Sequence, residues 1–139
     1  MKSMLERFET LRLFATCALV ALLVAAASGC GDVRGDAEHA ASEMTGGGNP
    51  RRGRAAIEHY GCASCHTIPG VRGADALVGP PLTQVAGRMY IGGVLTNSPE
   101  NMMRWIRNPQ GVDPLTAMPN LGIGDQDARD IASYLYTLK

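Results

Sequence analysis

The stretch Cys62-Ala63-Ser64-Cys65-His66 is the most informative part of the chain. It contains two cysteines three positions apart, followed directly by a histidine. The cysteine pair alone is compatible with a disulfide, half of a zinc site or a covalently attached haem. In a haem attachment, both thiols add to vinyl groups on one edge of the porphyrin, and the adjacent histidine binds iron. Cys62 and Cys65 are therefore candidate attachment residues, and His66 is a candidate iron ligand.

Two other chemistries fit the motif less well. A structural zinc site needs four ligands, yet the region around the motif has no second cysteine pair and offers only His59 and His66. A thioredoxin-like dithiol would lie beside strands, and no run of alternating apolar residues is found here. We therefore predict one covalent haem c as the cofactor.

Helix start signals surround the motif and predict three helices. Two of them are a good N-cap residue followed by proline, namely Asn49-Pro50 and Ser98-Pro99. The third is Gly124 followed by acidic residues, after which apolar residues recur with helical spacing. The predicted helices cover residues 51–61, 98–108 and 124–139.

Long loops separate these helices and set the predicted fold class. The loops at 67–82, 87–97 and 108–124 are rich in glycine and proline. Such a loop content is unusual for a small free-standing core, but loops that wrap a large prosthetic group would explain it. We predict an all-α domain of three main helices and long loops around one haem.

Residues 1–30 are typical of an export signal. Basic residues precede Leu13 to Ala27, a stretch of fifteen uncharged residues that is shorter than the ~20 residues of a comfortable membrane span. The sequence Ala27-Ser28-Gly29-Cys30 resembles a bacterial lipobox, and this implies lipidation at Cys30. Cleavage after Ala27, which would release a soluble protein, and an uncut membrane anchor are the alternatives.

Residues 31–49 differ from the rest of the chain in composition. They are small and polar and end in three consecutive glycines, so we expect a flexible tether. The compact domain is then predicted at residues 50–139.

Charge gives little information about partners. The full chain is formally neutral, and without residues 1–29 it has ten basic and eleven acidic residues. No basic excess indicates nucleic acid binding. We expect neither a nucleic acid partner nor a small-molecule substrate.

The sixth iron ligand is predicted from the loops. Met118 lies in the proline-stiffened segment Pro114-Leu115-Thr116-Ala117-Met118-Pro119, 52 residues after His66, where no helical stripe explains a methionine. His59 is the main rival, but it lies too close to the attachment edge to reach the opposite face easily. Met118 is therefore the predicted axial ligand.

These motifs together resemble class I cytochromes c. Residues 50–139 are similar to the small bacterial cytochrome domains fused to or encoded beside haem–copper terminal oxidases. Besides the attachment motif, Gly79-Pro80-Pro81-Leu82, Gly87-Arg88 and the approach to Met118 match the family. The resemblance implies that the Pro80 carbonyl accepts the ring N–H of the proximal histidine. It also implies haem contacts for Arg88, Trp105 and Thr116.

The function implied is single-electron transfer rather than catalysis. An iron with histidine and methionine ligands has no free position for substrate, and methionine raises its potential. We expect a carrier on the periplasmic side of a bacterial membrane, lipid-anchored, with a quinol-oxidising complex or other donor and a terminal oxidase or reductase as acceptor.

The alternatives to an electron carrier are a peroxidase-like catalytic subunit, a gas sensor and an accessory subunit. A peroxidase-like catalytic subunit needs an open sixth position and a distal acid or base, and no such group is found in the sequence. A gas sensor needs a signalling domain that does not fit in 139 residues. An accessory role in an oxidase complex would not need a tuned ligand set.

Overall fold

The computed structural model describes residues 33–139. The predicted export signal, with Cys30, lies outside this part of the chain. No helix among the described residues is long and apolar enough to cross a membrane. The regular elements, connected by long loops, are α2 (Val33–Met44), α3 (Pro50–His59), β1 (Tyr90–Ile91), β2 (Leu95–Thr96), α4 (Pro99–Arg107) and α5 (Asp125–Tyr136).

The three predicted helices are confirmed as α3, α4 and α5, and two of them begin at the predicted caps. The Asn49 side chain accepts hydrogen bonds from the backbone N–H groups of Arg51 and Arg52, both at 3.0 Å. The Ser98 hydroxyl accepts one from Asn101 at 3.3 Å. Each cap residue is followed by proline, whose missing N–H costs nothing in the first turn of a helix.

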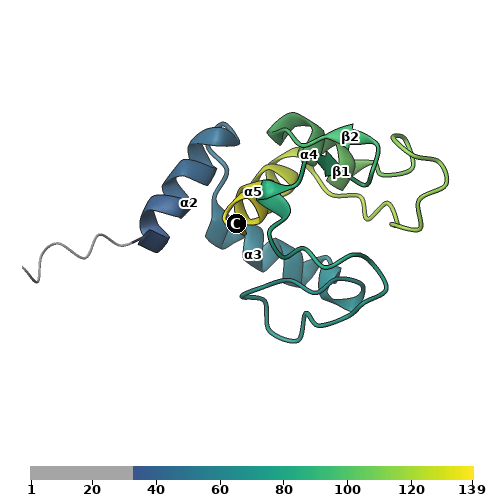
Figure 1. The fold of residues 1–139 in the computed structure, drawn as a ribbon, viewed down its shortest axis with the longest axis horizontal. Coiled ribbons are helices and arrows are strands. Elements are labelled where there is room, and N and C mark those ends of the chain that lie inside the picture. The colour runs from purple at the N-terminus through teal and green to yellow at the C-terminus, as the bar shows by residue number, and fades with distance from the viewer. Residues whose placement is uncertain (1–32) are drawn as a thin grey trace, which may run out of the picture. The chain divides into compact units, whose positions relative to one another are not determined.

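Helix α5 is the centre of the core. It packs against α3 on one side and α4 on the other (Figure 1). Its residues from Asp130 to Tyr136 are all buried, and Ile57 of α3 and Ile106 of α4 are buried in the same cluster. A chain with few aromatic residues thus builds its core around the buried C-terminal part of one helix.

Gly53 allows α3 and α5 to approach each other closely. It is buried, and a Cβ atom added there would lie 1.9 Å from the backbone oxygen of Asp130 and 2.9 Å from the nitrogen of Ile131. Because the obstructing atoms belong to the backbone of α5, no side-chain rotation can relieve the clash.

Gly53→Ala is therefore expected to destabilise the domain strongly. The helices must separate, which should cost about 3 kcal/mol, at the upper end of the usual cost of overpacking. Denaturant unfolding of the full chain carrying its cofactor measures this loss. Gly87→Ala is the control, because no atom lies within 4 Å of a Cβ added there. An unchanged midpoint for Gly53→Ala would contradict the close packing of α3 and α5.

Asp130 is a buried carboxylate that joins α5 to the start of α3. It is 1% exposed, and it accepts hydrogen bonds from the Asn49 backbone N–H at 2.7 Å and from Arg52 at 2.7 Å. Gln126 donates a further bond at 3.0 Å. Burial acts to raise the pKa of Asp130, but Arg52 and the two other donors outweigh it, and the pKa lies below its ordinary value.

This lowered pKa predicts how stability depends on pH. The carboxylate contributes stability above the unfolded-state pKa of about 3.9, and that contribution is lost as pH falls toward the lower folded-state pKa. Asp130→Asn should cost about 1.5–3 kcal/mol near neutral pH, the range for hydrogen bonds to a charged group. Unfolding curves at neutral pH and below about pH 3 should show the gap between wild type and variant closing in acid. A gap independent of pH would contradict the ionised state.

The prediction of a flexible tether is wrong for Val33–Met44, which form α2. The segment contains alanines and glutamates with high helix propensity, and ion pairs one turn apart support it, such as Arg34–Glu38 at 3.6 Å.

The C-terminal end of α2 contacts the domain, since Ala41 and Thr45 are buried. Arg129 of α5 donates to the carbonyls of Thr45 and Gly46, both at 3.1 Å. Composition alone does not reveal these contacts.

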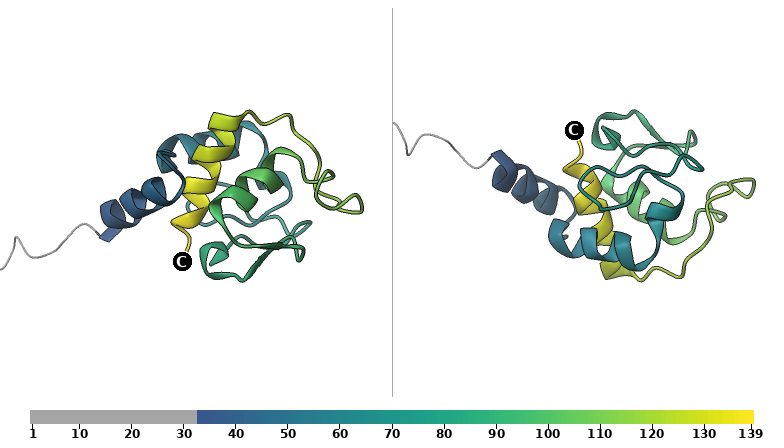
Figure 2. Two further views of the ribbon diagram at one scale, coloured as in Figure 1. Left: turned by 90° about the horizontal axis from the view of Figure 1, so that it is seen from above. Right: turned by 90° about the horizontal axis from the view of Figure 1, so that it is seen from below.

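The two loops that carry the candidate iron ligands extend from the same side of the helices. The loop after α3 and the loop between α4 and α5 both extend away from α2 (Figures 1 and 2). The predicted loop at 87–97 contains a short hairpin with two residues in each strand. Tyr90 pairs with Thr96 and Ile91 with Leu95. The two loops that extend away from α2 carry His66 and Met118.

Candidate functional site

The attachment motif follows directly after α3. Gly61 adopts a left-handed conformation, with φ 70°, which turns the chain out of the helix, and Cys62–Ser64 form one turn of 3-10 helix. The backbone N–H groups of Cys65 and His66 both donate to the carbonyl of Cys62, at 3.2 and 3.0 Å. Both cysteines are free thiols and partly buried. Burial raises the pKa of the Cys62 thiol.

His66 is oriented by one hydrogen bond. Its Nδ1 lies 2.8 Å from the carbonyl oxygen of Pro80. A carbonyl oxygen can only accept, so Nδ1 must carry the proton and the lone pair is on Nε2. A neutral imidazole held in this way leaves Nε2 free to bind a metal ion, and the hydrogen bond at Nδ1 would increase its donor strength.

Gly79 forms a cradle for the imidazole. A Cβ atom added at Gly79 would lie 2.4 Å from Cε1 and 2.8 Å from Nδ1 of His66, so the glycine backbone lies directly against the ring. The Gly79 N–H donates to the carbonyl of Cys65 at 2.7 Å, which fixes this approach. The residues present therefore fit a group that takes a nitrogen ligand from His66.

The loop that carries Met118 is shaped by its own polar groups. The backbone N–H of Met118 donates to the hydroxyl of Thr116 at 3.3 Å, and its carbonyl accepts from the Gln110 side chain at 2.7 Å. Asp113 supports the preceding turn, because its carboxylate accepts from the N–H of Leu115 at 3.0 Å. Thr116 thus positions Met118, while its own O–H stays available for a haem contact. Gln110 has no signal in the sequence that would have identified it.

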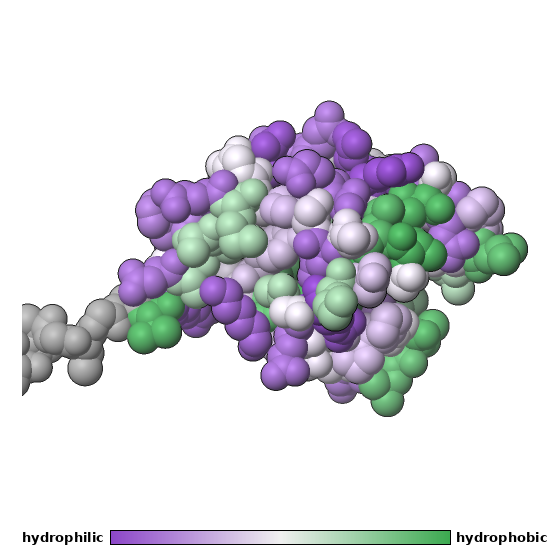
Figure 3. All heavy atoms as spheres, turned by 45° about the horizontal axis from the view of Figure 1, so that its top comes forward, coloured by the Kyte–Doolittle hydropathy of each residue, from purple (hydrophilic) through white to green (hydrophobic). Residues whose placement is uncertain are grey.

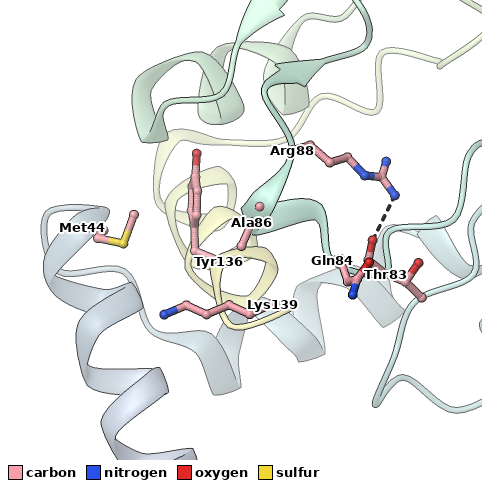
Figure 4. A pocket seen from close by; sticks show the side chains of 8 residues that line it. Met44, Thr83, Gln84, Ala86, Arg88, Tyr136 and Lys139 are labelled. Carbon is pink, nitrogen blue, oxygen red and sulfur yellow. Dashed lines mark hydrogen bonds between the residues drawn. The ribbon is translucent and has the colours of Figure 1, made fainter.

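Arg88 and Trp105 also make contacts that the sequence does not reveal. The Arg88 guanidinium donates to the carbonyls of Pro81 and Thr83, and Figure 4 shows the bond to Thr83. The Trp105 indole lies over Gly92, where an added Cβ would be 2.6–2.9 Å from three ring atoms. The predicted haem contacts of both residues stay predictions.

Large apolar side chains are exposed on the loops around these residues. Leu77, Val78 and Leu115 are each between 77% and 94% exposed. Figure 3 shows several strongly apolar groups among polar ones on the face that it views. Exposed apolar side chains on loops that also carry His66 and Met118 fit residues that pack against a large apolar ring.

An open pocket of about 720 Å³ lies elsewhere (Figure 4). It is formed by the end of α2, the segment from Thr83 to Arg88 and the end of α5. None of Cys62, Cys65, His66 and Met118 lines it. The pocket is therefore not the predicted haem site.

Comparison with known proteins decides the family. The family model described as Cytochrome c matches residues 50–139. The chain belongs to the cytochrome c family. This confirms the predicted all-α cytochrome c fold and supports a haem-based electron-transfer protein with covalently bound haem c.

Two relatives of this cytochrome are subunits of oxidases. The chain is similar to "Cytochrome c oxidase subunit 2" of Alkalihalophilus pseudofirmus, with 34% identity over 89 residues, 63% of this chain. It is also similar to "Cytochrome c oxidase subunit 2" of Bacillus sp. (strain PS3), with 28% identity over 88 residues, 60% of this chain. The chain spans a quarter of the length of each of these relatives. No solved structure matches it.

Proposed function

We propose that this cytochrome is a mono-haem electron carrier with His66 and Met118 as axial ligands. The observation that carries the proposal is the hydrogen bond from His66 Nδ1 to the Pro80 carbonyl, at 2.8 Å. It leaves Nε2 as a strong and correctly oriented nitrogen donor. When bound, haem c supplies an iron that exchanges one electron without a change of ligands.

The two axial residues have different tasks. His66 donates through Nε2 and is prevented from rotating by Pro80 and by the backbone of Gly79. Met118 offers a neutral thioether, which favours reduced iron and raises the potential. Its loop is held by Gln110 and Thr116. With both positions filled, neither a substrate nor a gas would have access to the metal.

The remaining site residues hold the cofactor in place. Cys62 and Cys65 form thioether bonds to it from a single turn of the backbone. The Arg88 guanidinium, the Trp105 indole and the Thr116 hydroxyl would contact its propionates or its edge. By covering the group these side chains would limit the access of water, which would further raise the potential.

The place of the cytochrome in a reaction chain follows from its relatives and its N-terminal sequence. We infer that residues 1–30 direct export and that lipidated Cys30 anchors the domain to the periplasmic side of a bacterial membrane. A quinol-oxidising complex or another donor supplies electrons, and a terminal oxidase or reductase accepts them. The similarity to oxidase subunits supports an oxidase as acceptor.

A spectroscopic redox titration tests the carrier function. The protein is produced with its haem, and its visible spectrum is followed against potential, with and without carbon monoxide. A carrier shows one reversible one-electron transition that carbon monoxide does not move. A low potential, or one that shifts when carbon monoxide is added, would indicate an open iron and a catalytic or accessory subunit instead.

A further inference from the structure

Asn97 lies at the centre of a partly buried group of hydrogen bonds that does not include the predicted iron ligands. Its side-chain NH₂ donates to the carbonyls of Val85 and Arg88, at 2.9 and 2.8 Å. Its side-chain oxygen accepts from the Tyr136 hydroxyl at 2.7 Å. Burial, and to a smaller extent Glu100, raises the pKa of Tyr136 to about 12, so this hydroxyl stays protonated. Asn97 thereby connects the end of α5 to the loop that contains Val85 and Arg88.

The same loop contains a strained residue. Gln84 has φ 54° and ψ 24°, and it is the only non-glycine residue with positive φ among those described. Such a conformation is strained for a residue that has a side chain, and it persists where neighbouring contacts impose it. The contacts here are the two bonds from Asn97 and one from the Ala86 N–H to the carbonyl of Leu138, at 3.2 Å.

Arg88 connects the residues held by Asn97 to the segment next to the hydrogen-bond partner of His66. While its backbone carbonyl is held by Asn97, its guanidinium donates to the carbonyls of Pro81 and of Thr83, the latter at 3.0 Å. Pro81 follows directly on Pro80, the residue that accepts from His66. An unbroken series of bonded groups therefore runs from Tyr136 through Asn97 and Arg88 to the partner of His66.

We propose that Asn97 and Tyr136 are positioning residues for the proximal iron ligand. This inference rests on the proposed role of His66. The two residues hold the Pro80 carbonyl at bonding distance from Nδ1 and so set how strongly His66 donates to iron. A looser carbonyl weakens that bond, makes His66 a poorer donor, destabilises the oxidised metal and raises the potential.

Tyr136→Phe and Asn97→Ala test the proposal in the protein carrying its haem. Tyr136→Phe removes one hydroxyl and keeps the buried ring. Asn97→Ala removes the hydrogen bonds to Val85, Arg88 and Tyr136 together. We expect the Nδ1–H proton of His66 to exchange with deuterium roughly three- to tenfold faster, the factor that one lost net hydrogen bond gives. The potential should shift upward in both variants, more in Asn97→Ala, while the methionine–ferric charge-transfer band is retained.

Tyr134→Phe is the matched control. Tyr134 lies two residues earlier in α5, is also buried, and donates to the carbonyl of Pro69 at 2.6 Å instead. It should lose similar stability with no change in the exchange of His66 or in the potential. Equal shifts for Tyr134→Phe and Tyr136→Phe, or none in Tyr136→Phe and Asn97→Ala, would overturn the positioning role. A wild type that lacks the charge-transfer band would instead refute the proposed function.

Discussion

Met118→Ala is expected to open the sixth position of the iron and lower the reduction potential. Alanine has no donor atom, so the reduced variant should bind carbon monoxide and the charge-transfer band of the oxidised form should disappear. The potential should fall by roughly 0.1–0.3 V, part of the about 0.8 V that axial ligands span. Visible spectra with and without carbon monoxide, together with a redox titration, measure all three effects.

Met89→Ala is the control for this experiment. Met89 is also a loop methionine and is 77% exposed, so its removal should leave the spectrum and the potential as in wild type. If Met89→Ala opened the iron and Met118→Ala did not, the assignment of the sixth ligand would be wrong.

Gly79→Ala is expected to act on the opposite side of the iron. The added methyl group would lie 2.4 Å from the His66 ring, so either the ring or the loop containing Pro80 must move. We expect a low yield of protein with attached haem and a loss of at least about 2–3 kcal/mol in the free energy of unfolding. In the protein that does form, loss of the bond to Pro80 should raise the potential.

Met118→Ala should therefore lower the potential and Gly79→Ala should raise it. The sign of the shift distinguishes the loss of one iron ligand from the weakening of the other. Haem content per chain, denaturant unfolding and potential should be measured on the same preparations. Gly87→Ala again serves as the control because its methyl group meets no other atom. A Gly79→Ala protein with normal haem content and potential would show that the glycine does not support His66.

The starts of two helices could be predicted, and the candidate haem-attachment residues could be named, because their signals are local. Asn49-Pro50 and Ser98-Pro99 specify helix starts within two residues, and Cys62, Cys65 and His66 form one continuous motif. Helix α2 was not predicted because its local signals, several alanines and glutamates and an ion pair one turn apart, are weak. The contacts that attach its end to the domain, such as that between Arg129 and the carbonyl of Thr45, are distant in sequence. A composition of small polar residues gives no indication of them.

The supporting groups of the site could be predicted only in part. The carbonyl of Pro80 was inferred from a resemblance, and its 2.8 Å distance from His66 agrees with that inference. The bonds of Gln110 to Met118 and of Tyr136 to Asn97 join residues without any motif. Gly79 belongs to a motif that matches the family, but its contact with the His66 ring appears only when the chain is folded.

The most direct test of the central claim is the proton NMR spectrum of the reduced protein with labelled methionine methyl groups. A methyl group held over the iron lies in the ring current of the porphyrin, and its signal moves far upfield. We predict one such signal, absent in Met118→Ala and present in Met89→Ala. A spectrum with no upfield methionine methyl group, or one whose signal persists in Met118→Ala, would contradict ligation of the iron by Met118.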